Sequence, residues 1–330
     1  MNILFINSRK FDYGQDLLFT GLNELNESCS VHSQPWRLSY YLPTQSYPKN
    51  LGYIGYKKIL SSFKNISPES TDLVIVGAAK PDAFETYLSL IKRIPKSTPV
   101  YFIDGGDREE LGGDLARAGA FELYQKAEDI RPFDLIFKRE YLKSNKYESR
   151  VKPLPFSINI KALNMLPSPK KERDVFFWAI ESHPIRKTAF QLLSQSFDQD
   201  GGVGQSQSMK SYKFKGRRYH EELSRSKIGI SLRGGGWDTL RYWEVPALGA
   251  MMITTPLDIV IPNDFEDKKH VIRCQPDLSD LVELCNYYVK NDSERSKIIA
   301  AGYKHLLEHH TSQARAKYVL SFFNKGLNAK

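Results

Sequence analysis

The sequence predicts an α/β protein in which helices cover two parallel β-sheets. Short runs rich in β-branched and aliphatic residues recur along the chain and alternate with stretches of helical spacing. Most of the short runs are continuously apolar, which is typical of strands buried on both faces of a parallel sheet. A proline-rich segment at 151–173 interrupts the alternation, which restarts at Asp174 and so indicates two halves.

The apolar runs and the helical spacing locate the individual elements. In the first half we expect strands at 3–6, 73–76, 100–103 and 135–137, and helices at 16–27 and 81–92. In the second half we expect strands at 175–178, 228–232, 251–254 and 271–273, and helices at 185–194, 219–225, 278–290 and 294–308. The stretch 198–209 is rich in Gly, Ser and Gln and predicts a loop.

Length and charge limit the classes of function. A chain of 330 residues suits two domains, 1–155 and 156–330, and its 47 basic and 38 acidic residues give a net charge of +9. That charge indicates an anionic partner, which could be nucleotide phosphates, a membrane surface or nucleic acid; a generally basic surface is the alternative. No apolar run approaches the ~18 residues of a membrane span, and no secretory signal is recognised. Three scattered cysteines, Cys29, Cys274 and Cys285, indicate a reduced, cytoplasmic compartment.

The strongest candidate site follows the expected strand at 228–232. Three glycines at 234–236 allow backbone N–H groups to approach a ligand closely. Asp238 or Thr239 can cap the helix that begins next, and the N-terminus of such a helix favours a phosphate. We therefore include Gly235, Gly236 and Thr239 in a predicted nucleotide site.

Charged side chains flank the glycines. Arg241 and Glu244 are three residues apart, so they share one face of the expected helix. We interpret Arg233 and Arg241 as phosphate ligands and Glu244 as the acceptor of hydrogen bonds from both ribose hydroxyls. The alternative is a flexible loop beside a surface Arg–Glu pair worth ~0.2–0.5 kcal/mol.

Two blocks of the second half resemble a known family. Residues 241–254, Arg-Tyr-Trp-Glu-Val-Pro-Ala-Leu-Gly-Ala-Met-Met-Ile-Thr, resemble the donor-site signature of bacterial group 1 glycosyltransferases, in particular the subgroup named after spore-maturation proteins. Residues 277–320, which include Ala301-Gly302 and the run from His309 to Arg315, are similar to the closing pattern of that family. The first half resembles it only loosely, at 102–107, 137–141 and 154–156.

The resemblance implies a GT-B fold, in which two Rossmann-like domains face each other across a cleft. It implies that the second domain holds a nucleotide-sugar donor, with Glu244 at the ribose and Arg241 and its preceding loop near the diphosphate. It implies that the last helix, about 313–328, packs back on the first domain, and that no metal is needed. One position departs from the pattern: Gly236 stands where retaining enzymes often carry a second glutamate, so the stereochemistry stays open.

Two further groups of residues suit glycosyl transfer. Arg186 and Lys187 open the helix that follows the strand at 175–178, where they would neutralise the leaving diphosphate; a solvated helix end is the alternative. Asp104 and Asp107 follow the strand at 100–103 and are candidates for the base that deprotonates the acceptor, although Asp-Gly is also ordinary turn chemistry. Asp12, in the first β–α turn, is a further candidate for this base.

We therefore predict a metal-independent glycosyltransferase that uses a nucleotide-diphosphate sugar, most consistently a UDP-sugar, and requires no cofactor. The acceptor hydroxyl could belong to a glycan, a small molecule or modified DNA. One alternative is a phage-type GT-B enzyme that glycosylates hydroxymethylated DNA bases, which strong salt-dependent DNA binding would distinguish. Another is a non-catalytic nucleotide-sugar-binding module, which would bind the donor without turnover.

Overall fold

The computed structural model describes residues 1–25, 29–42, 44, 51, 54–56, 59–62, 66–163, 167, 170–197, 202–206 and 216–328. The chain forms two compact units. The first comprises Met1–Ala162, Val260–Pro262 and Thr311–Lys330, and the second comprises Leu163–Ile259 and Asn263–His310. The chain first passes from the first unit to the second between Ala162 and Leu163, slightly after the boundary that the sequence predicts at 155/156. Two later segments also belong to the first unit.

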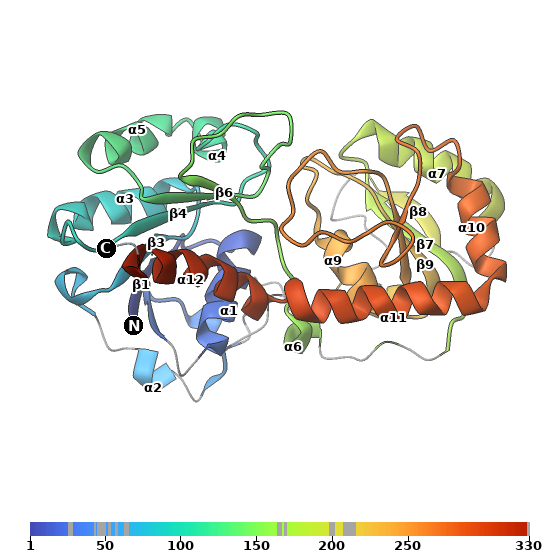
Figure 1. Ribbon diagram of the computed structural model, residues 1–330, viewed down its shortest axis with the longest axis horizontal. Helices are drawn as coiled ribbons and strands as arrows, with labels where there is room; N and C mark the ends of the chain where they lie inside the picture. The colour runs from blue at the N-terminus through green and yellow to red at the C-terminus, as the bar shows by residue number, and fades with distance from the viewer. Residues whose placement is uncertain are drawn as a thin grey trace. The chain divides into compact units, whose positions relative to one another are not determined.

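The first unit is built on a six-stranded sheet in the order β2-β1-β3-β4-β5-β6 (Figure 1). Its strands are β1 (Asn2–Ile6), β2 (Ser30–Gln34), β3 (Leu73–Val76), β4 (Val100–Asp104), β5 (Leu135–Lys138) and β6 (Val151–Pro153). Its helices include α1 (Tyr13–Glu24), α2 (Ile59–Ser62), α3 (Pro81–Leu90), α4 (Gly113–Arg117), α5 (Phe121–Ile130) and α12 (Ser312–Asn328), with α6 (Ile160–Leu163) at its end. Every strand pairing in this sheet is parallel.

Alternate side chains of the strands pack against different helices. The face that carries Leu4 and Ile6 forms one core with α3 and α5. Phe5 points to the other face, where its ring lies 5.2 Å from that of Phe19 in α1. The last helix, α12, lies beside α1 (Figure 1), and a Cβ atom on Gly21 would come within 2.0 Å of the Ser312 carbonyl oxygen. A glycine at position 21 therefore allows the close approach of these two helices within the first unit.

The second unit has a five-stranded sheet in the order β11-β10-β9-β7-β8, again with only parallel pairs. Its strands are β7 (Arg173–Ile180), β8 (Val203–Ser206), β9 (Ser226–Ser231), β10 (Met251–Thr254) and β11 (Ile272–Arg273). Its helices include α7 (Pro184–Phe197), α8 (Arg217–Ser224), α9 (Leu240–Ala247), α10 (Leu281–Lys290) and α11 (Asp292–His309).

Strand β9 shows how this second core is divided. Ile228 and Ile230 pack on the face that α7 and α10 cover. Gly229, which points the opposite way, faces Leu223 of α8 and Val245 of α9, and a Cβ atom there would come within 2.8–2.9 Å of both side chains. The missing side chain lets both helices sit close to the strand, directly beneath the predicted nucleotide site.

The predicted α/β class and the parallel sheets are confirmed. The expected strands and helices recur with shifts of a few residues at their ends. Three strands were not predicted: β2 is polar, β6 ends in a proline, and β8 lies in the Gly/Ser/Gln-rich stretch. The loop prediction for 198–209 is wrong at Val203–Ser206, which pairs with β7; residues 198–201 and 207–209 lie outside the described part of the chain.

Candidate functional site

The second sheet changes its winding direction between β7 and β9. Strand β7 lies inside the sheet, with β8 added on one side and β9, β10 and β11 on the other. Ligands of open α/β sheets bind at such a switch point, beyond the carboxyl ends of the strands. All the predicted nucleotide ligands lie in the loops that follow β7 and β9, or in helices α7 and α9.

Arg186 connects these two loops. Its Nε atom donates to the Arg233 carbonyl oxygen at 2.8 Å and its Nη2 atom to the Leu232 carbonyl oxygen at 3.0 Å, while Nη1 donates to Ile180 at 3.0 Å. The side chain is buried, and a Cβ atom on Gly234 would lie 2.8 Å from Nη2. Arg186 therefore holds the glycine loop against the end of β7 and places a positive charge next to this loop.

Three more basic groups gather at the same place. The Arg233 guanidinium stacks 4.0 Å above the Trp237 ring, and its buried Nε has no hydrogen-bond partner among the described residues. Burial, together with the charges of Arg233 and Arg186, lowers the pKa of His183. Lys187 is exposed in the first turn of α7. Arg186, Arg233 and Lys187 therefore give this cluster positive charge, which suits a phosphate group.

The glycine loop leads into the N-terminus of α9. Gly235 is exposed, Gly236 is buried, and the loop turns through a 2.9 Å hydrogen bond from the Gly234 amide to the Gly236 carbonyl oxygen. Thr239 occupies the N-cap position, but its side chain makes no capping hydrogen bond. The alternative cap, Asp238, instead accepts a 2.8 Å hydrogen bond from the Trp243 indole. The first amides of α9 are therefore not capped by Thr239, and the N-terminus of a helix suits an anion.

Helix α9 presents Arg241 and Glu244 to helix α8. The Arg241 guanidinium donates to the Tyr219 hydroxyl at 3.1 Å and to the Trp178 carbonyl oxygen at 2.5 Å. Glu244 is 5% exposed, and its carboxylate oxygen Oε1 is hydrogen-bonded to the Nε2 atom of His220 at 3.2 Å. The two residues predicted to share a face thus bind adjacent residues of a neighbouring helix. Arg241 is turned toward protein groups rather than outward to the cluster of basic residues.

His183, Tyr219 and His220 are not among the site residues predicted from the sequence. His183 had a usable signal, because it stands immediately before the helix that carries Arg186 and Lys187. Tyr219 and His220 had none, since nothing in a single sequence shows that α8 packs beside α9.

In the first unit, Asp104 lies inside the protein. Its side chain is 1% exposed and forms a 2.9 Å ion pair with Lys138, which also donates to the Arg108 and Glu110 carbonyl oxygens. Burial raises the pKa of Asp104, although the Lys138 ammonium opposes the rise. These contacts give Asp104 a structural role at the ends of β4 and β5, contrary to the sequence-based prediction of a base.

Asp107 has the opposite environment. Its side chain is half exposed and pairs with the Arg139 guanidinium. Partial burial opposes the shift, but Arg139 lowers the pKa of Asp107, so the carboxylate holds a proton poorly. Arg139 also contacts Glu140 at 3.1 Å and is therefore shared between two carboxylates. Asp107 is reachable from solvent, but its chemistry suits an ion pair better than proton abstraction.

The Asp12 side chain is largely buried, but one of its oxygens lies next to two glycines. Its Oδ1 atom caps α1 by accepting a 3.1 Å hydrogen bond from the Gln15 amide, and its Oδ2 atom lies 3.7 Å from the Lys80 ammonium. Burial raises the pKa of Asp12, while Lys80 opposes the rise. The positions that Cβ atoms would take on Gly14 and Gly105 lie 3.5 and 3.6 Å from Oδ1, so space next to this oxygen is free of side chains.

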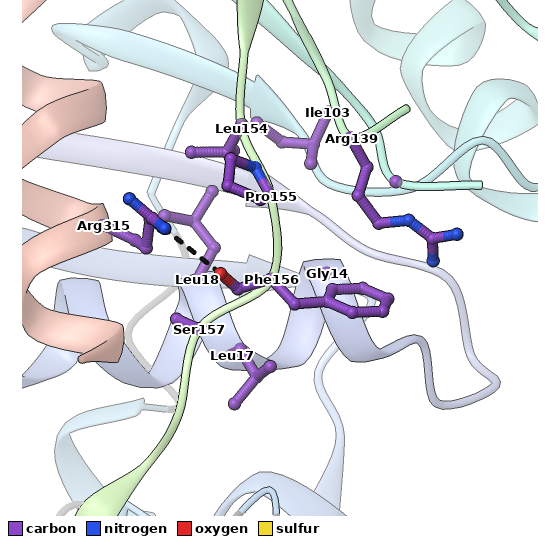
Figure 2. A pocket seen from close by; sticks show the side chains of 11 residues that line it. Gly14, Leu17, Leu18, Ile103, Arg139, Leu154, Pro155, Phe156, Ser157 and Arg315 are labelled. Carbon is purple, nitrogen blue, oxygen red and sulfur yellow. Dashed lines mark hydrogen bonds between the residues drawn. The ribbon is translucent and has the colours of Figure 1, made fainter. Parts of the chain in front are cut away.

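A small pocket adjoins those glycines (Figure 2). Gly14 and Gly105 form part of its wall, together with Phe156 and Arg139, whose guanidinium lies 4.3 Å from the Phe156 ring centroid. Arg315 of α12 fixes the backbone there by donating to the Phe156 carbonyl oxygen at 3.2 Å. The first unit therefore offers a mixed apolar and basic pocket at the carboxyl edge of its sheet, close to Asp12.

Comparison with known proteins identifies a family that part of the chain resembles. Residues 183–321 match the family described as "Glycosyl transferase-like". The match covers most of the second unit and the first part of α12. None of the curated proteins compared with the chain matches it.

Solved glycosyltransferases share the whole fold. An alpha-glucosyltransferase in complex with UDP and a 13-mer DNA superposes with a TM-score of 0.65 at 13% identity, covering 98% of this chain and 100% of that one. Anabaena Alr3699/HepE in complex with UDP-glucose gives 0.62 at 11% identity, covering 98% and 100%. The predicted GT-B fold is therefore confirmed, and the matching family confirms the predicted enzyme class, a glycosyltransferase.

Proposed function

We propose that this glycosyltransferase takes its sugar from a UDP-sugar and transfers it to an acceptor hydroxyl without a metal ion. The observation that carries the proposal is the switch point between β7 and β9, where Arg186 of α7 holds the loop of Arg233 and the buried carboxylate of Glu244 stands in the helix that follows that loop. A carboxylate suits the ribose hydroxyls and the basic cluster suits the diphosphate. The solved relatives named above were complexed with UDP or UDP-glucose.

The basic cluster would act on the leaving group. Negative charge grows on the diphosphate as the glycosidic bond breaks, and fixed positive groups lower the energy of that transition state. Arg233, Lys187 and the first amides of α9 would contact the phosphates, and Arg186 would hold their loop. Of the described residues, no group of three or more His, Cys, Asp or Glu side chains is placed to hold a metal ion.

The subgroup of the family and the location in the cell are part of the same proposal. Membership of the subgroup named after spore-maturation proteins rests on the signature at 241–254. A cytoplasmic location rests on three free cysteines. Among the described residues, no helix is both long enough and apolar enough to cross a membrane.

A thermal-shift panel of UDP, GDP, dTDP, ADP and CMP in the presence of EDTA tests the donor site. A ligand present at 100 times its Kd adds about 2.7 kcal/mol of stability, which raises Tm by several degrees in a domain of this size. We expect UDP to give the largest shift and EDTA to leave it unchanged. No shift with any of the nucleotides would contradict the proposal, and loss of the UDP shift in EDTA would contradict metal independence.

We propose Asp12 as the base that deprotonates the acceptor hydroxyl. Asp12→Asn should lower kcat by about 10²- to 10⁴-fold, the usual contribution of a general base, and leave UDP affinity unchanged. Asparagine also caps helices well, so α1 should persist. Asp107→Asn is the matched control and should have a smaller effect. Steady-state kinetics with a turned-over acceptor would measure both, and a wild-type kcat in Asp12→Asn would remove Asp12 from the mechanism.

Modified DNA is a second candidate acceptor. The net charge of +9 favours a polyanion, and one similar structure is an alpha-glucosyltransferase bound to DNA that contains an HMU base, with a TM-score of 0.59 at 13% identity over 97% of this chain. Binding to duplex DNA should then weaken as salt is added: log Kd should rise steeply and linearly with the logarithm of the salt concentration. DNA binding that is absent at low salt would exclude this acceptor and leave glycans and small molecules.

A further inference from the structure

The side chain that orients Glu244 belongs to helix α8. Its two consecutive residues Tyr219 and His220 contact Arg241 and Glu244 of α9, at 3.1 and 3.2 Å. Gly229 of β9 allows both helices to lie close to the sheet, because a Cβ atom at this position would come within 2.8–2.9 Å of Leu223 and Val245. The His220–Glu244 contact is therefore built by core packing and does not wait for a ligand.

The chemistry of the pair defines which atom donates. An ionised carboxylate only accepts hydrogen bonds, so the Nε2 atom of His220 must carry the proton and donate it to Oε1 of Glu244. The two side chains are 9% and 7% exposed. Of the described residues, only His220 hydrogen-bonds this carboxylate, which leaves its other oxygen to accept from a ligand.

This arrangement also removes conformational freedom. A glutamate side chain rotates about three bonds, and ordering it on binding costs free energy that weakens affinity. Glu244 is ordered beforehand, because burial and the bond to His220 hold it in one orientation.

We propose that His220 is a positioning residue for recognition of the donor ribose: it holds Oε1 of Glu244 so that the carboxylate meets the ribose hydroxyls. This inference rests on the proposed function, because it assigns His220 to the same donor site. It predicts a specific loss, confined to ligands that carry those hydroxyls.

The test is a binding cycle with two ligands, UDP and 2′,3′-dideoxy-UDP, measured by isothermal titration calorimetry. In the wild type, UDP should bind more tightly than the dideoxy analogue. His220→Ala should weaken UDP by about 5- to 30-fold, as expected for one charge-assisted hydrogen bond, and should leave the dideoxy analogue unchanged. His220→Gln, whose amide can place an N–H donor near the same point, should restore most of the UDP affinity.

Tyr219→Phe is the matched control on the same helix turn. It removes the hydroxyl that bonds Arg241, so any loss should be equal for the two nucleotides. The inference is overturned if His220→Ala weakens both nucleotides equally, or if it leaves UDP binding intact while Glu244→Gln loses it. A wild type that binds no UDP would overturn the proposed UDP donor itself, and this inference with it.

Discussion

Glu244→Ala should weaken UDP binding by at least about 100-fold, because it removes an ionised acceptor for two ribose hydroxyls. A hydrogen bond to a charged group contributes about 1.5–3 kcal/mol, so two such bonds exceed the 2.7 kcal/mol that a 100-fold change requires. The variant also leaves the buried His220 donor without its acceptor, which adds to the cost. Isothermal titration calorimetry with UDP measures the change directly.

Two further variants keep this experiment interpretable. Glu244→Gln preserves the size of the side chain but removes its charge and replaces one acceptor oxygen by an NH2 donor, so it separates lost recognition from a lost fold. Glu221→Ala, on an exposed part of α8 where Glu221 pairs with Arg217, should bind UDP like the wild type. Wild-type affinity in both Glu244 variants would show that the ribose is bound elsewhere.

Lys138→Met should destabilise the first unit by about 3–5 kcal/mol, the usual cost of leaving one partner of a buried ion pair alone. The Asp104 carboxylate would lose its counter-ion in a place where the two side chains are 1% and 0% exposed. The carbonyl oxygens of Arg108 and Glu110 would also lose their donor. Differential scanning calorimetry should show Tm lower by about 6–20 °C.

The pH dependence identifies the cause of that loss. Burial raises the pKa of Asp104 above its unfolded value. A group with a raised folded pKa stabilises the fold below its unfolded pKa, and this contribution is lost as the pH rises through the folded pKa. The deficit of Lys138→Met against the wild type should therefore be smaller at pH 5 than at pH 8.

A double variant provides the control. Asp104→Asn with Lys138→Met removes both charges and keeps an acceptor for the Gly112 amide, which now bonds Asp104 at 3.1 Å. It should recover much of the lost stability, and its own Tm should no longer depend on the titration of Asp104. A single Lys138→Met variant as stable as the wild type would contradict the structural role of the pair.

Local patterns were sufficient for most of the fold. The runs at 73–76 and 251–254 are uninterrupted and apolar, and the structure has strands at those positions. The glycines and capping residues around 234–239 likewise indicated a strand, a loop and a helix in that order. Such signals are readable because they arise from neighbours in the chain. Strands β2 and β8 carry no such pattern, since their places depend on the partner strands β1 and β7.

The sequence by itself determined the α/β class, the two halves and the segment 233–244 in which we propose the donor site. Only the tertiary structure decided what each charged side chain does there. It set Arg186 behind the glycine loop, brought His220 to Glu244, and paired Asp104 with Lys138 in the core. The partners in these three pairs are 47, 24 and 34 positions apart in the chain. The first and third pairs meet because strand order brings the carboxyl ends of distant strands to one edge of a sheet. The second pair meets because α8 packs beside α9, and no local pattern encodes either arrangement.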